Sequence, residues 1–145
     1  MIKFILMINK QGQTRFSHYY TSLSVAEKCA LEGEIFRKCL CRDENQSSFM
    51  HIRQHKIVYR RYASLYIIIG ATESENELAL IELIHNIVET LEGYFESVCE
   101  FDIMFNLEKV HYIINELICN GRIIDTNRSN VLHPLFLMDK APKNA

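Results

Sequence analysis

The sequence lacks several features that mark particular classes of protein. It has no apolar run of the ~20 residues that a membrane-spanning helix needs, since its uninterrupted apolar runs, such as Phe4–Ile8 and Tyr66–Ala71, are far shorter. Its formal net charge is only -2, so it has no general attraction to nucleic acid or other polyanions. It has 5 glycines and 2 prolines and no low-complexity stretch. We therefore expect an ordered, soluble protein.

A chain of 145 residues usually forms one domain around one core. We expect a single domain over residues 1–140 and a short tail over 141–145. The apolar start of the chain has no small-residue cleavage site and runs directly into polar residues. It is therefore interpreted as a first strand and not as a signal peptide.

The five cysteines are an odd number and are scattered among apolar residues. This distribution predicts reduced, buried thiols and no disulfides. Cys39 and Cys41 are separated by one residue, whereas common zinc and redox motifs have a two-residue spacer. The sequence therefore predicts neither a metal site nor a cofactor. The cysteines are Cys29, Cys39, Cys41, Cys99 and Cys119.

The first half of the chain has the pattern of two strands, one helix and three further strands. Gly12 suits a hairpin turn after the first strand. Ser24 is a candidate N-cap for a helix, whose apolar face is predicted from the spacing of Val25, Cys29, Phe36 and Leu40. The further strands are expected at Thr14–Tyr20, Ser48–Ile52, Lys56–Tyr62 and Ala63–Gly70.

The pattern of the second half predicts helices. Ser74–Glu77 matches a capping box before an almost wholly apolar helix, Leu78–Phe95, which should be buried on several sides. A further helix, Leu107–Leu117, is expected to end in a cap at Asn120–Gly121. A last helix should run from about Asn127 toward Met138. This order predicts an α+β domain with an antiparallel sheet of about five strands covered by helices.

Candidate catalytic side chains are few. His51 and His55 lie near strands, where a four-residue spacing does not create a shared face. His85 lies on the apolar helix without an accompanying nucleophile or phosphate loop, so it is interpreted as a core or interface histidine. We predict no catalytic residue and no enzyme activity. A cluster of basic residues is expected to form a charged interface: Arg53, Lys56, Arg60 and Arg61.

Several segments together resemble the small (sigma) subunits of adaptor-protein complexes. They are Lys10–Arg15, Val58–Tyr66, Ile84–Glu89 and Val98–Asn106. The resemblance extends from Met1 to about Lys140. Within the family, three further segments are most similar to the fourth adaptor complex (AP-4): Gly33–Leu40, Asp125–Arg128 and Leu137–Lys140.

The resemblance implies a longin-like fold and a role without catalysis. A sigma subunit would contact a large adaptin chain, most similar to the epsilon type, in a heterotetramer with a second large (beta) chain and a medium (mu) chain. The complex would collect the cytosolic tails of transmembrane cargo at trans-Golgi or endosomal membranes. The sigma subunit itself would contact the membrane only through the complex. The fourth adaptor complex is usually described as independent of clathrin.

The resemblance also implies a cargo site. Related subunits bind cargo tails that carry an acidic residue, three spacer residues and a Leu-Leu or Leu-Ile pair. The two aliphatic side chains of the tail enter an apolar pocket of the subunit. Arg15 matches the position that attracts the acidic residue. Ser97, Phe101 and Ile103 depart from the common pattern, which would alter the shape of the pocket. The matching pocket positions are Ala63, Leu65, Val88, Ser97, Val98 and Ile103.

Three other interpretations remain open from the sequence. The same apolar positions could simply fill the interface between sheet and helices. The chain could be another longin-type trafficking subunit, similar to coatomer zeta or a tethering-complex subunit. It could also be a small enzyme that uses a cysteine with His85, which would require one unusually reactive thiol.

Overall fold

The computed structural model describes residues 1–42, 48–96, 98–123 and 128–140, with the side chains of 128 and 129 left aside. The first half has two strands, one helix and three more strands, and helices dominate the second half. The elements are β1 (Ile2–Asn9), β2 (Thr14–Tyr19), α1 (Val25–Leu40), β3 (Phe49–Ile52), β4 (His55–Tyr62), β5 (Leu65–Ala71), α2 (Glu77–Phe95), α3 (Glu100–Phe105), α4 (Leu107–Leu117), β6 (Ile118–Cys119), β7 (Arg122–Ile123) and α5 (Arg128–Lys140).

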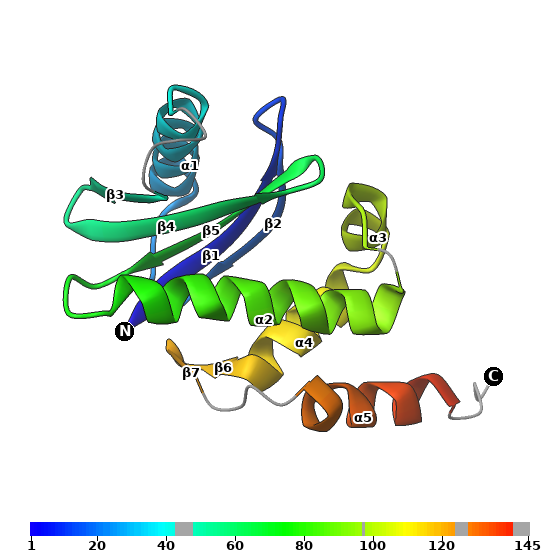
Figure 1. Cartoon of the computed structure of the whole chain (residues 1–145). Helices are drawn as coiled ribbons and strands as arrows, with labels where there is room; N and C mark the ends of the chain where they lie inside the picture. The colour runs from blue at the N-terminus through cyan, green and yellow to red at the C-terminus, as the bar shows by residue number, and fades with distance from the viewer. Residues whose placement is uncertain (43–47, 97, 124–127, 141–145) are drawn as a thin grey trace.

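Five strands form one antiparallel sheet in the order β2-β1-β5-β4-β3. The helix α1 covers one face, and α2 with α4 covers the other, while α5 packs outside α2 and α4 (Figure 1). The predicted α+β class and the five-stranded sheet covered by helices are confirmed, and the arrangement is longin-like. The two-layer cover explains why the central strands are apolar on both sides.

The central strand β1 shows how the two faces are assigned. Ile5 and Met7 point into the core under α2 and α4, whereas Leu6 and Ile8 point into the core under α1. This alternation follows from the two-residue period of a strand. All four side chains are at most 1% exposed. Both faces of β1 are therefore buried in the core.

The helix α1 begins at its predicted cap but buries a different face. The Ser24 hydroxyl accepts from the Glu27 amide, and the Glu27 carboxylate accepts from the Ser24 amide. Most of the predicted face was wrong, because Val25 is 78% and Leu40 52% exposed and Cys29 is exposed as well. Of the four predicted residues only Phe36, partly buried, packs against the core on this side of the sheet. A second apolar stripe is rotated by roughly 100° around the helix from the predicted one. The sheet covers this second stripe, which consists of Leu31, Ile35 and Cys39.

Two predicted helix ends were also wrong. The cap of α2 is Asn76, whose side chain accepts from the amides of Leu78 and Ala79, and not the box Ser74–Glu77. The helix α4 ends at Leu117, and Asn120 and Gly121, with φ of 50° and 81°, form the turn between β6 and β7. Positive φ at both positions suits a tight hairpin turn as well as a helix end.

The buried-thiol prediction was wrong for four cysteines. Only Cys39 is buried, and the other four are exposed, although all five are free. His85 is also exposed, with its Nε2 3.0 Å from the Glu89 Oε1, so it is not a core histidine. No group of three metal-binding side chains occurs in the described residues. Among the described helices, none combines the length and apolarity needed to span a membrane.

Candidate functional site

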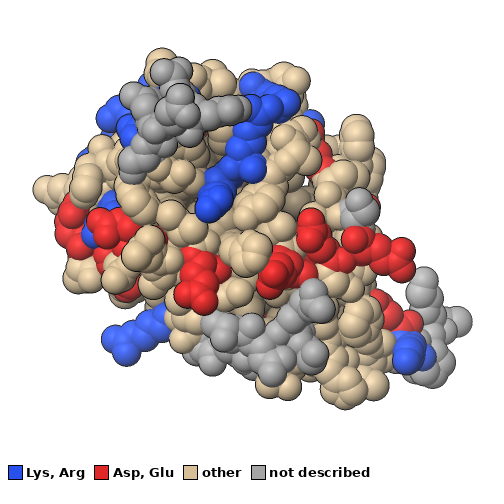
Figure 2. Space-filling model, in the orientation of Figure 1, with Lys and Arg blue, Asp and Glu red and all other residues tan. Residues whose placement is uncertain are grey.

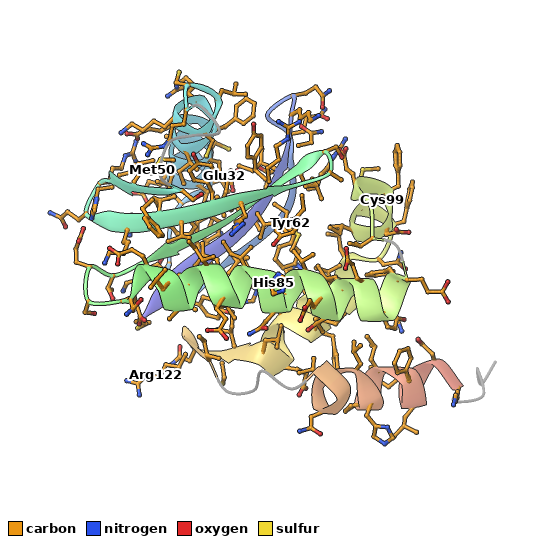
Figure 3. The ribbon with its side chains drawn as sticks, viewed as in Figure 1. Glu32, Met50, Tyr62, His85, Cys99 and Arg122 are labelled. Carbon is orange, nitrogen blue, oxygen red and sulfur yellow. The ribbon has the colours of Figure 1, made fainter. Side chains whose placement is uncertain are left out.

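A small cavity lies where three elements meet. The tip of the β4–β5 hairpin, the C-terminal half of α2 and the start of α3 enclose a volume of about 100 Å³. Figure 3 shows Tyr62 at the end of β4, above α2, and Cys99 where α3 begins. The lining is mainly apolar with a few polar groups, as small binding sites usually are. It consists of Tyr62, Ala63, Ser64, Leu65, Ile67, Val88, Leu91, Glu92, Val98, Cys99, Glu100 and Ile103.

Five of the six predicted pocket positions line this one cavity. Leu65, Val88 and Ile103 are at most 5% exposed and form its floor. Ala63 is exposed, and Val98 is partly buried. The sixth position, Ser97, lies outside the described residues. The sequence positions therefore converge in space, whatever occupies the cavity.

The hairpin tip places Ala63 beside the cavity. Tyr62 and Leu65 pair across β4 and β5, which leaves Ala63 and Ser64 as a two-residue turn. Ala63 has a φ of 52°, in the left-handed region that two-residue hairpin turns require but that residues with a Cβ disfavour. The tight turn brings the end of the sheet close to α3.

Arg15 adjoins the cavity through an ion pair with Glu100. The Arg15 Nε donates to the Glu100 Oε1 at 2.6 Å, and its Nη2 donates to the Gln13 side chain at 2.9 Å. Asn9 Nδ2 also donates to the Glu100 Oε1, at 2.8 Å. The predicted acid-binding arginine is therefore next to the predicted pocket, and it already has an acidic partner in this chain.

Glu100 is the main residue that the sequence reasoning missed. Hydrogen bonds from Asn9 and then Arg15 hold the pKa of its carboxyl below the usual value, against a smaller desolvation effect. The position lies inside the motif Val98–Asn106, but a glutamate two residues after Val98 indicates nothing until β1, β2 and α3 are known to meet. Because its pKa is lowered, the Glu100 carboxylate is ionised at neutral pH.

The predicted basic interface is split by the fold. Lys56 is 7% exposed, and its Nζ donates to the carbonyls of Glu73 and Glu75 and pairs with the Glu77 carboxylate. It secures the connection between β5 and α2, so its assignment to an interface was wrong. Arg60 and Arg61 are exposed on β4. Figure 2 shows basic side chains above a band of acidic ones.

A family model supplies the decisive comparison. The model of the clathrin adaptor complex small chain matches residues 1–142. The chain belongs to this family. It is therefore a small subunit of adaptor-complex type, a class of protein that acts in vesicle trafficking.

Individual relatives agree with this assignment. The chain is 56% identical over 140 residues to the AP-4 complex subunit sigma of Arabidopsis thaliana, covering 97% of this chain and 98% of the relative. It is 50% identical over 140 residues to the AP-4 complex subunit sigma-1 of Homo sapiens, covering 97% of each. The predicted similarity to the AP-4 sigma subunit is confirmed.

A structural neighbour supports the fold assignment. A chain of a homology model of the full-length AP-3 complex in a stretched open conformation superposes with a TM-score of 0.77. The two chains are 26% identical, and the match covers 97% of this chain and 94% of the other. An adaptor small-subunit fold is therefore shared over nearly the whole length.

Proposed function

We propose that this small chain binds cargo tails bearing an acidic residue, three spacers and a leucine pair, through the cavity beside α3. The main support for this proposal is one apolar cavity next to Arg15, whose lining includes five of the predicted pocket residues: Ala63, Leu65, Val88, Val98 and Ile103. Ser97 remains part of the proposal as a pocket position. The leucine pair would enter the cavity, and the acidic residue would lie toward Arg15.

The energetics of such a site suit reversible capture. Burying two leucine-sized side chains contributes roughly 3–6 kcal/mol before the cost of ordering the tail. This is enough for weak recognition and too little for stable capture by one contact. Arg15 lies at the rim, where a charge mainly tunes association rate and selectivity.

The chain would act within a heterotetramer. The expected partners are a large adaptin chain of epsilon type in direct contact, a beta-type large chain and a medium mu chain. Support comes from the similarity to AP-4 sigma subunits and from exposed apolar side chains such as Phe101 and Phe105, 61% and 75% exposed, which a partner surface would cover. The complex would work without enzymatic activity, from the cytoplasm, at trans-Golgi or endosomal membranes.

A binding experiment on the assembled complex tests the cargo site. Val98→Ser should weaken binding of an acidic dileucine peptide, because it adds a hydroxyl and removes apolar surface at the cavity. The matched control is Leu78→Ser, since Leu78 is 74% exposed at the other end of α2. Equal affinities for wild type and Val98→Ser, with the complex intact, would remove the cavity from cargo binding.

Purification tests the partner proposal separately. A tagged copy should co-purify from native cytosol with two large chains and one medium chain in comparable amounts, at salt concentrations that remove loose contacts. Elution of the protein alone as a stable monomer would contradict the heterotetramer.

A further inference from the structure

The charge balance at the cavity is unfavourable for an acidic ligand. Two carboxylates, of Glu92 and Glu100, line the cavity, and no lysine or arginine is among its described lining residues. Arg15 contributes one positive charge, through its pair with Glu100. An approaching acidic side chain therefore meets an arginine whose charge is already balanced.

The donors of Arg15 are partly engaged by this chain. Its Nε is 2.6 Å from the Glu100 Oε1, and its Nη2 is 2.9 Å from the Gln13 Oε1. The side chains of Arg15 and Glu100 are 25% and 16% exposed, so the ion pair is only partly accessible to water. Charge-assisted pairs of this length are stronger than neutral hydrogen bonds.

The pair is held in place by a buried asparagine. Asn9 is 2% exposed at the end of β1, and its Oδ1 accepts from the amides of Gln11 and Gln13. Its Nδ2 donates to the Gln13 side chain and to Glu100. The β1–β2 turn and α3 are thus joined through one amide, and Glu100 is fixed against Arg15 before any ligand arrives.

We propose that Glu100 is a built-in competitor that occupies Arg15 until the acidic residue of a cargo tail displaces it. This inference rests on the proposed function, because it assigns regulation to the same site. Glu100 lowers the gain in affinity from the acidic residue, so Arg15 alone discriminates weakly between acidic and neutral tails.

The substitution Glu100→Gln tests the competition. Glutamine keeps the shape and can still accept from Asn9, but it removes the charge opposite Arg15. Dissociation constants are measured on the assembled complex for three peptides: one with glutamate at the acidic position, one with glutamine there, and one with both leucines changed to alanine. We expect the preference for glutamate over glutamine to rise roughly two- to fivefold, the range that exposed charge pairs give.

Two control variants make the result specific. Glu92→Gln removes an equal charge from the same cavity, but Glu92 has no ion pair with Arg15 among the described residues, so it should change the preference less. Arg15→Gln combined with Glu100→Gln should abolish the gain. An unchanged or lower preference in Glu100→Gln, or an equal rise in Glu92→Gln, overturns the competitor role.

The peptides also separate the two proposals. If every variant binds the leucine-pair and alanine-pair peptides equally, the cargo site itself is wrong. If the leucine pair is required but the glutamate preference does not respond to Glu100→Gln, only the competition is wrong.

Discussion

The ring of Phe4 on β1 lies directly over Gly70, its partner residue on β5. A Cβ at Gly70 would overlap the ring. Phe4 is 1% exposed and packs against Tyr19 and His55, so it has little room to move. Gly70 is therefore required for packing, and its φ is not among the positive ones.

Gly70→Ala should consequently destabilise the fold by about 1–3 kcal/mol, the usual cost of overpacking. Urea denaturation of the purified chain measures the change in the free energy of unfolding. Phe4→Leu should recover part of the loss in the double variant, because it removes the ring that the new methyl group would meet.

The same substitution at Gly33 provides the control. A Cβ there would lie 3.6 Å from Arg37 Nη1, an ordinary contact, on the helix α1. Gly33→Ala should stabilise by roughly 0.5–1 kcal/mol, because glycine is a poor helix former. Two glycine-to-alanine changes would thus have opposite signs, and a stabilising Gly70→Ala would contradict the packing argument.

A pair of histidines joins β2 to α4. The Nδ1 atoms of His18 and His111 are 3.4 Å apart, and the ring of His111 packs against Phe16. Burial, and secondarily His111, lowers the pKa of His18, and burial lowers the pKa of His111. Both rings therefore favour the neutral state in the folded protein.

This pair should make stability fall with acidification. Because the folded pKa values are lower than the unfolded value of ~6.5, the unfolded chain binds more protons as pH falls through that value. We expect the free energy of unfolding to decrease from pH 7 to about pH 5.5. The carboxylates with lowered pKa, such as Glu100, lose their contribution only at lower pH, below about 4.5.

A double variant, His18→Gln with His111→Gln, should reduce this pH dependence. It should not abolish it, because the pKa of His55 is also lowered, mainly by burial. His133→Gln on the exposed face of α5 is the control for removing a histidine. Urea denaturation at several pH values measures the slope, and an equal slope in wild type and the double variant would refute the assignment.

The sequence predicted the sheet and most helices because their patterns are local. Ser24 and Glu27 specify their cap within four residues, and the apolar runs of β1 and β5 identify buried strands by themselves. The face of α1 was wrong because two apolar stripes adjoin and only the tertiary structure decides which one meets the sheet. The six-residue α3 was missed because one or two turns carry no measurable periodicity.

The candidate site also has a part that could be predicted from the sequence and a part that could not. Its apolar positions were found through resemblance, and the fold brings Leu65 of β5, Val88 of α2 and Ile103 of α3 together. The pairing of Arg15 with Glu100 was not predictable, because 85 residues separate them. Their contact depends on the β1–β2 turn meeting α3, a long-range feature that no local pattern encodes.

Cys99 offers a direct probe of the cavity, because its exposed thiol lies in the lining. In the assembled complex, an acidic dileucine peptide at ten times its dissociation constant should slow alkylation of Cys99 about tenfold, in proportion to the unoccupied fraction. Cys29, exposed on α1, should react equally with and without peptide. Burial raises the pKa of Cys39 to about 12, so this thiol should react only on unfolding and serves as a check of integrity. Mass spectrometry of the alkylated cysteines gives each rate, and equal Cys99 rates with the leucine-pair and alanine-pair peptides would show that the tail does not cover the cavity.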